Sequence, residues 1–241
     1  MRAFFSLLIV ISLAACASSG PKGEAVLRPG PQRLPTMRAQ GDLIIATLQG
    51  ATVTVQPLTR EGLDAYYSRR PSLVNPFKTL QKGGNRPLAF IVWIQNIGRD
   101  RVNFEPSQAL LVDQQDRRAA AFSYDELYSI FSEIDQPDRA LQALQETVLT
   151  NFLVIPPKID RAGLLLFPRP EPEAKIVILD MGSFYVGSVE QLLLFEFEVT
   201  RVPYQGARGR RASLQSFHPR SLPSLHRTSE PKPRALRLHS G

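Results

Sequence analysis

The clearest strand signal in the chain is the run LAFIVWI at residues 88–94. Every position in this run is apolar, so we expect a central strand of a sheet that is covered on both faces. The run is followed by the turn sequence NIG at 96–98, and Val102 and Phe104 then alternate with polar neighbours. Such alternation is typical of a strand with one buried face. Together these segments predict the centre of a β-rich domain.

Shorter apolar runs lie on both sides of this segment, at 43–46, 51–55, 109–113, 163–167, 175–179, 184–186 and 192–199. Turn residues separate them at frequent intervals, as in antiparallel sandwiches. Two helical patterns interrupt the strands. Thr59 is placed to cap a short helix through Tyr67, and Ser123 opens a helical insertion over 123–149.

A resemblance supports this fold class. The segments FIVWIQN at 90–96 and VNFEP at 102–106 resemble the central strand and turn of Ig-like domains common in bacterial surface lipoproteins. The resemblance implies a mainly β fold, an Ig-like antiparallel β-sandwich over residues 42–202, with the 123–149 insertion as a departure from it. A lipocalin-like barrel would give similar strand counts. Antibody-type Ig domains are excluded because the chain has one cysteine.

The first sixteen residues resemble a targeting signal. Arg2 is followed by an apolar run over 4–13, which is shorter than the ~20 residues that span a bilayer. The run ends in LAAC at 13–16, which resembles the lipobox of a bacterial lipoprotein signal peptide. The resemblance implies removal of residues 1–15, a diacylglycerol on the Cys16 sulfur and palmitate-type acylation of the new amino terminus. An ordinary signal peptide with an incidental cysteine is the alternative.

The segment after the cysteine is predicted to be a flexible tether over 16–41, since proline and glycine punctuate it. No aspartate follows Cys16. In a Gram-negative lipoprotein this favours the outer membrane, with the domain facing the periplasm.

The basic charge is concentrated at the other end. The formal net charge is +7, but nine lysines and arginines against one acid, Glu230, lie between 201 and 241. The high pI is therefore no argument for nucleic-acid binding by the folded body. We expect a disordered basic tail over 203–241, in which Arg208, Arg210 and Arg211 contact anionic lipid or acidic polymer. An out-of-frame gene end would give a similar composition.

Catalytic chemistry is sparse. His218, His226 and His239 all lie in the tail, so a histidine-based triad or zinc site inside the domain is excluded. No phosphate-binding glycine motif is present. We expect no enzyme activity, no cofactor and no metal. Five carboxylates are candidates for hydrolysis of an envelope polymer or, alternatively, for turns and helix starts: Asp113, Asp116, Asp125, Glu126 and Asp180.

Recognition is expected on the loop at 59–82 and the insertion at 123–149, because loops on a rigid scaffold carry most binding sites. Tyr66, Tyr67, Tyr124 and Tyr128 are predicted to form an exposed aromatic surface there. The alternative is that such aromatics cover the core, with Tyr66, Tyr67 and Phe77 packed back onto the domain. The sequence thus predicts a membrane-anchored lipoprotein that acts as a non-catalytic binding or assembly module for an envelope protein. A carrier or sensor that holds an apolar ligand between the sheets near Trp93 is an alternative.

Overall fold

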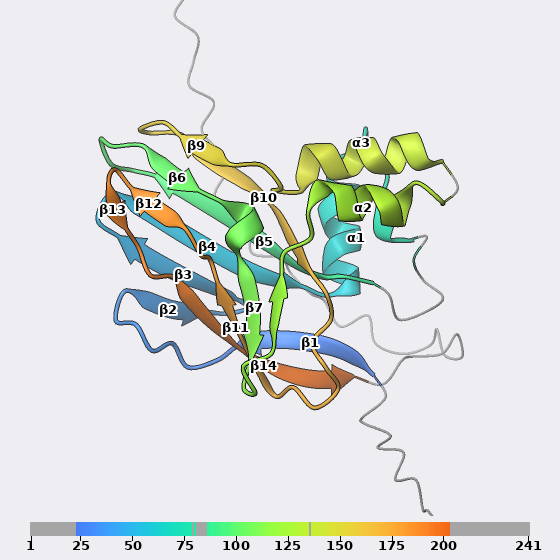
Figure 1. Ribbon diagram of the computed structural model, residues 1–241, viewed down its shortest axis with the longest axis horizontal. Helices are drawn as coiled ribbons and strands as arrows, with labels where there is room; N and C mark the ends of the chain where they lie inside the picture. Colours follow the sequence, from blue (N-terminus) through green and yellow to red (C-terminus); the bar gives the residue numbers. More distant parts are fainter. Residues whose placement is uncertain (1–22, 79, 81–85, 135, 203–241) are drawn as a thin grey trace, which may run out of the picture. The chain divides into compact units, whose positions relative to one another are not determined.

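The computed structural model describes residues 23–202 except 79, 81–85 and 135. The predicted signal peptide 1–15, Cys16 and the predicted tail 203–241 lie outside this part of the chain. The described residues form three antiparallel sheets with three α-helices (Figure 1). The predicted mainly β, antiparallel sandwich with a helical insertion is confirmed.

The first sheet joins strands from both ends of the domain. Its order is β1 (Glu24–Pro29), β14 (Leu194–Val202), β11 (Ile176–Asp180), β7 (Leu110–Asp113) and β8 (Arg118–Ala120). The pairing of β1 with β14 brings Leu27 opposite Val199. The amino-terminal strand is therefore held by the carboxy-terminal strand of the domain.

The second sheet contains the central strand predicted from the sequence. Its order is β10 (Asp160–Phe167), β5 (Leu88–Asn96), β4 (Ala51–Leu58), β3 (Leu43–Leu48) and β2 (Met37–Gln40). Val92 of β5 lies opposite Gly163 on one side and Val55 on the other. The prediction of a central strand at 88–94 is confirmed.

A smaller third sheet has the order β13 (Val189–Glu190), β12 (Phe184–Val186), β6 (Val102–Phe104) and β9 (Leu153–Ile155). It contributes Phe104 and Phe184 to the main core. Their ring centroids lie 5.8 Å apart. The third sheet thus shares its buried face with the other two.

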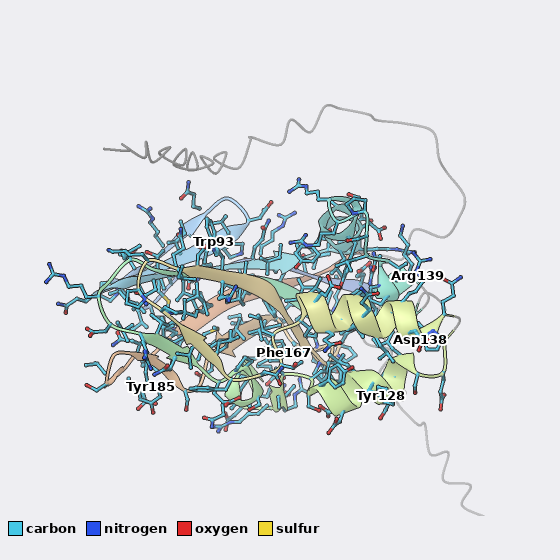
Figure 2. All side chains as sticks on the ribbon, turned by 90° about the horizontal axis from the view of Figure 1, so that it is seen from above. Trp93, Tyr128, Asp138, Arg139, Phe167 and Tyr185 are labelled. Atoms are coloured by element: carbon cyan, nitrogen blue, oxygen red, sulfur yellow. The ribbon has the colours of Figure 1, made fainter. Side chains whose placement is uncertain are left out.

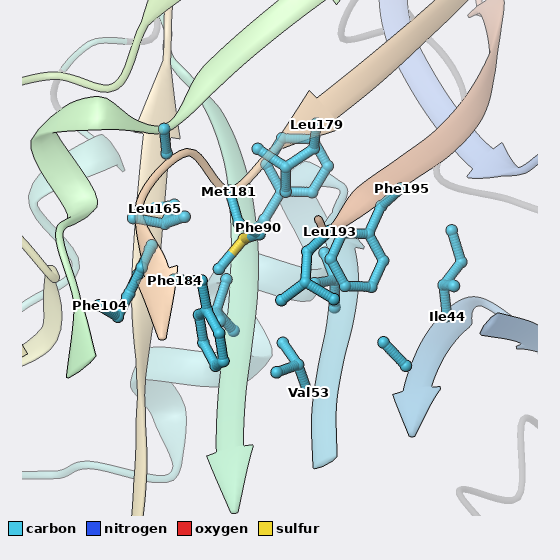
Figure 3. Close-up of a cluster of buried hydrophobic side chains, with 14 of the residues drawn as sticks. Ile44, Val53, Phe90, Phe104, Leu165, Leu179, Met181, Phe184, Leu193 and Phe195 are labelled. Carbon is cyan, nitrogen blue, oxygen red and sulfur yellow. The ribbon is translucent and has the colours of Figure 1, made fainter. Parts of the chain in front are cut away.

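The main core lies between the sheets (Figure 3). Phe90, Val92 and Ile94 of β5 are fully buried in it, as the two-residue alternation of a strand requires. The Phe90 ring lies 5.8 Å from Phe167 and 5.3 Å from Phe197. Aromatic rings at these spacings contribute packing energy beyond their area.

A second core lies on the other face of β5 and β10, under four helical segments: α1 (Arg60–Ser68), a 3-10 turn at Pro76–Lys78, α2 (Tyr124–Phe131) and α3 (Pro137–Thr147). We call these segments the helical layer. Ala89, Leu164 and Leu166 of the sheet face it. Figure 1 shows the helices gathered beside the Leu88 end of β5. The predicted short helix and the predicted insertion are both confirmed, and they pack together.

The predicted tether is wrong for residues 24–40. This segment supplies β1 and β2, so the domain begins at Glu24 rather than at Asp42. The link between them is also fixed, because Gln32 Nε2 donates to the Glu196 carbonyl at 2.9 Å and Arg33 pairs with the Glu196 carboxylate at 2.9 Å. Proline and glycine at 29–31 end β1. Because these residues are typical of linkers, the sequence pattern predicts a tether here in place of a strand.

Candidate functional site

Two of the four predicted surface tyrosines are buried. Tyr66 is 9% exposed and Tyr67 is 3% exposed, so their predicted exposure is wrong. Their rings form a T-shaped contact at 5.3 Å, and Tyr67 lies 6.1 Å from Phe77 of the 3-10 turn. The Arg70 guanidinium stacks on the Tyr66 ring, with its Cζ 3.7 Å from the ring centroid. Both tyrosines belong to the second core.

Tyr67 fixes α1 to α3 by a buried hydrogen bond. Its hydroxyl lies 2.8 Å from Thr147 Oγ1, and Thr147 Oγ1 itself donates to the Ala143 carbonyl at 2.6 Å. Since the threonine proton is already committed, the tyrosine hydroxyl is the donor to Thr147. Burial raises the pKa of Tyr67, so its neutral, donating form persists at physiological pH.

The other two tyrosines are exposed on α2. Tyr124 is 36% exposed and Tyr128 is 50% exposed. One helical turn separates them, and their ring centroids lie 6.5 Å apart. Figure 2 shows Tyr128 at the outer side of the helical layer. The predicted aromatic surface therefore consists of the Tyr124–Tyr128 pair alone.

Local structure holds this pair in place. Ser123 caps α2 by accepting from Glu126 N, and the Glu126 carboxylate accepts from Ser123 N at 2.8 Å. This capping box satisfies helix-terminal groups in both directions. On the other side, Leu127 and Phe131 are buried in the second core. The two exposed rings thus project from a helix that is fixed at its start and along its inner face.

An open depression of about 410 Å³ lies beside Tyr124. It is lined by Ser123, Tyr124, Asp125, Gln145, Thr150 and Asn151. We call Tyr124, Tyr128 and this depression the docking surface. The sequence did not single out Gln145, Thr150 or Asn151, because only the fold brings the end of α3 beside the start of α2.

The carboxylates considered for hydrolysis hold turns and helix caps. Asp113 Oδ1 accepts from Gln115 N and Arg117 N, and Asp113 Oδ2 accepts from Arg117 Nε at 2.6 Å. Burial alone would raise the pKa of Asp113, but these hydrogen bonds and the Arg117 charge hold it below its usual value. Asp180 Oδ1 accepts from Gly182 N at 2.9 Å. These bonds favour the structural interpretation of both groups.

The remaining three carboxylates lie in the same kind of environment. Asp116 pairs with Arg118 at an exposed turn, and Asp125 lies in the first turn of α2. Hydrogen bonds from Ser123 lower the pKa of Glu126. In the part of the chain described here, no group of three or more His, Cys, Asp or Glu side chains is placed to hold a metal ion.

Trp93 does not lie between the sheets. It alternates with Val92 and Ile94, which face the main core, and its indole Nε1 donates to Asp160 Oδ2 at 2.9 Å in an exposed position. Figure 2 shows Trp93 on the outer side of the second sheet. The position predicted for it in the ligand-carrier alternative is therefore wrong.

Four predicted functional residues, Cys16, Arg208, Arg210 and Arg211, lie outside the described residues. Among the helices that are described, none has the length and apolar character needed to cross a membrane.

Comparison with known proteins adds little to this geometry. No family model and no curated protein matches the chain. A solved structure with partial similarity is the yjhA protein from Bacillus subtilis, which is 16% identical, with a TM-score of 0.26. The match covers 39% of this chain, and the chain spans a little over half, 56%, of that protein. A likeness this weak says nothing about the fold or the function of this chain.

Proposed function

We propose that this chain is a lipid-anchored lipoprotein of the periplasm that acts as a non-catalytic binding or assembly module. It docks an envelope protein partner through the docking surface on the helical layer. The observation that carries the proposal is the exposed Tyr124–Tyr128 pair, which projects from a capped and packed helix beside an open depression.

Aromatic side chains in such a position suit protein recognition. Tyrosine supplies a large contact area at low conformational-entropy cost, and its hydroxyl remains able to hydrogen bond. The depression beside it adds polar groups from Gln145, Thr150 and Asn151. Tyrosine is also one of the residues enriched at interface hot spots.

The anchor part of the proposal depends on the LAAC motif at 13–16. Acylation of Cys16 inserts several chains into the outer membrane, and each buried methylene contributes about 0.8 kcal/mol. The basic tail from 203, with Arg208, Arg210 and Arg211, provides a second contact with anionic lipid or polymer. The proposal needs no cofactor, metal or nucleic acid.

The docking surface is tested by chemical crosslinking in intact cells followed by capture of the protein. We compare the wild type, the double variant Tyr124→Ala/Tyr128→Ala and a control double variant, Val189→Ala/Leu192→Ala. The control removes two apolar side chains in and beside β13 that are more exposed than the tyrosines. The same partner should appear at stoichiometric yield with wild type and control, and about tenfold less with the tyrosine variant. Equal yields from all three would exclude the docking surface.

The anchor is tested by intact-mass analysis of the protein from its native membrane, with globomycin-treated cells as control. The proposal requires a mature chain that begins at triacylated Cys16. An unlipidated mature mass would overturn the proposed localisation.

A further inference from the structure

A buried arginine just before the central strand has a side-chain nitrogen without a hydrogen-bond partner. Arg86 lies two residues before β5 and is 9% exposed. Its Nε is fully buried and has no hydrogen-bond partner. In the described part of the chain, no carboxylate forms an ion pair with it. Leaving a buried guanidinium N–H without a hydrogen-bond partner is costly unless something compensates it.

Arg86 lines a small recess together with two further arginines. Arg60 opens α1, and Arg169 follows β10 by two residues. The register of β10 with β5 pairs Phe167 with Leu88, so its continuation brings Arg169 beside Arg86. Arg169 Nε accordingly donates to the Arg86 carbonyl at 2.7 Å. The fold therefore gathers three guanidinium groups from three separate segments.

The acidic groups near the recess do not balance this charge. Glu24 of β1 also lines the recess, and Asp64 lies within electrostatic range of Arg86. Asp64 already accepts from Asn75 Nδ2 at 2.6 Å. Desolvation is the largest effect and lowers the pKa of Arg86, the charges of Glu24 and Asp64 raise it, and the charges of Arg60 and Arg169 lower it. The recess is thus an electropositive site that would gain from an anion.

The amino terminus of α1 lies at the same recess. Thr59 lines the recess and caps the helix by accepting from Gly62 N at 3.2 Å, while Leu63 N donates to the Thr59 carbonyl. The backbone N–H groups of Arg60 and Glu61 precede the first intrahelical bonds, and helix starts of this kind attract anions.

We propose that this recess binds a phosphate group. The enclosed space is about 10 Å³, room for one water-sized atom. One phosphate oxygen fits there against Arg86, and the other oxygens remain at the open mouth, near Arg60 and Arg169. A tetrahedral dianion suits donors that approach from three segments, whereas a carboxylate offers two oxygens in one plane. The source is either a free phosphate or a phospholipid headgroup.

The test measures binding of inorganic phosphate to the full-length protein by isothermal titration calorimetry at fixed ionic strength. The variants are Arg86→Gln, Arg60→Gln and the control Arg38→Gln, which removes an exposed arginine of β2. Arg60 is exposed, so Arg60→Gln keeps the test valid if Arg86→Gln fails to fold. We expect Arg60→Gln to weaken binding about tenfold and Arg38→Gln less than twofold.

A second arm measures binding to vesicles that contain phosphatidylglycerol. The basic tail is present in all variants, so any binding of the tail to the vesicles contributes equally to each. The recess is therefore judged by the difference in vesicle affinity between Arg60→Gln and Arg38→Gln. A difference with free phosphate alone identifies a soluble phosphate, and a difference with vesicles identifies a headgroup. The proposal is overturned if neither arm separates the two variants. Because the recess lies apart from Tyr124 and Tyr128, this outcome leaves the docking surface unaffected.

Discussion

Asn96, at the end of the central strand, connects three segments through one side chain. It is 2% exposed, and its Nδ2 donates to the Asp100 carbonyl at 2.7 Å and to the Ile155 carbonyl at 3.0 Å. Its Oδ1 accepts from Gly98 N at 3.1 Å. A buried amide with this many bonds specifies the turn after β5 and the end of β9 together.

The substitution Asn96→Ala should therefore lower the free energy of unfolding by about 3 kcal/mol, since it leaves buried backbone groups without partners. Urea unfolding followed by circular dichroism measures the change. Asn103→Ala, in β6, is the matched control and should cost under about 1 kcal/mol. A loss at position 96 no greater than at 103 would show that the side-chain bonds do not specify the turn.

The hydroxyl of Tyr67 allows a second test at the scale of a single residue, because it forms the buried hydrogen bond with Thr147. Tyr67→Phe removes only the hydroxyl that donates to Thr147, so we expect a loss of about 1 kcal/mol in unfolding free energy. Tyr185→Phe, on the outer face of β12, should have almost no effect. If the two variants unfold alike, the bond between α1 and α3 contributes nothing measurable.

These residues show what sequence patterns can predict at this scale. The Asn-x-Gly turn was recognised because one of its bonds is local: Gly98 N donates to Asn96 Oδ1, two residues earlier. Its second bond, to the Gly50 carbonyl at 2.7 Å, joins a distant segment and was not predicted. The sequence left both burial and exposure open for Tyr66 and Tyr67, because their burial depends on α3, which lies about 70 residues further along the chain. Periodicity within a short helix does not reveal which distant element covers it.

At the scale of elements, the turn between β7 and β8 should respond to pH. The pKa of Asp113 is lowered in the folded state, so its stabilising effect is present above its unfolded pKa of about 3.9. It is lost as the pH falls through the lower, folded value. Glu126 at the start of α2 behaves in the same way.

Asp113→Asn should therefore lower stability at pH 7 and flatten the acid-induced decline of the wild type. Urea midpoints at pH 7 and at steps below pH 4 measure both effects. Asp116→Asn is the control, because its ion pair with Arg118 is exposed and worth little. An unchanged acid slope in Asp113→Asn would contradict the role of this carboxylate in the turn.

Elements were predicted unevenly for physical reasons. A long apolar run such as β5 can be predicted as a strand from the local sequence alone, and a capped helix such as α2 can be predicted in the same way. β1 and β2 were missed because each has few buried positions, and their stability comes from pairing with β14 and β3. A short strand at a sheet edge depends on its partner more than on its own composition.

For the whole molecule, the amino-terminal boundary gives a direct prediction. A chain that begins at Gly23 keeps β1 and β2, whereas one that begins at Asp42 loses both and leaves β14 as an unpaired edge. We expect the first to unfold at the temperature of the mature protein. The second should unfold at a much lower temperature or aggregate. Circular dichroism melting and size-exclusion chromatography compare them, and equal behaviour would show that 24–40 is dispensable.

The candidate sites depend on the assembled fold more than the strands do. The docking surface joins α2 to the end of α3 and the residues just after it, and the arginine recess joins β1, α1 and the ends of β5 and β10. Only Tyr124 and Tyr128 were identified from sequence, through their place in an insertion. Arg86 and Arg169 could have been found from their matching positions just outside two paired strands.

The most direct test of the proposed docking function is site-specific photocrosslinking in living cells. Benzoylphenylalanine is placed at Tyr128 and, in a matched control, at Leu192, which is similarly exposed but lies near β13. The account predicts one discrete protein adduct at position 128 that is absent at position 192 and is lost when Tyr124→Ala is added. No adduct at 128, or the same adduct at both positions, would contradict it.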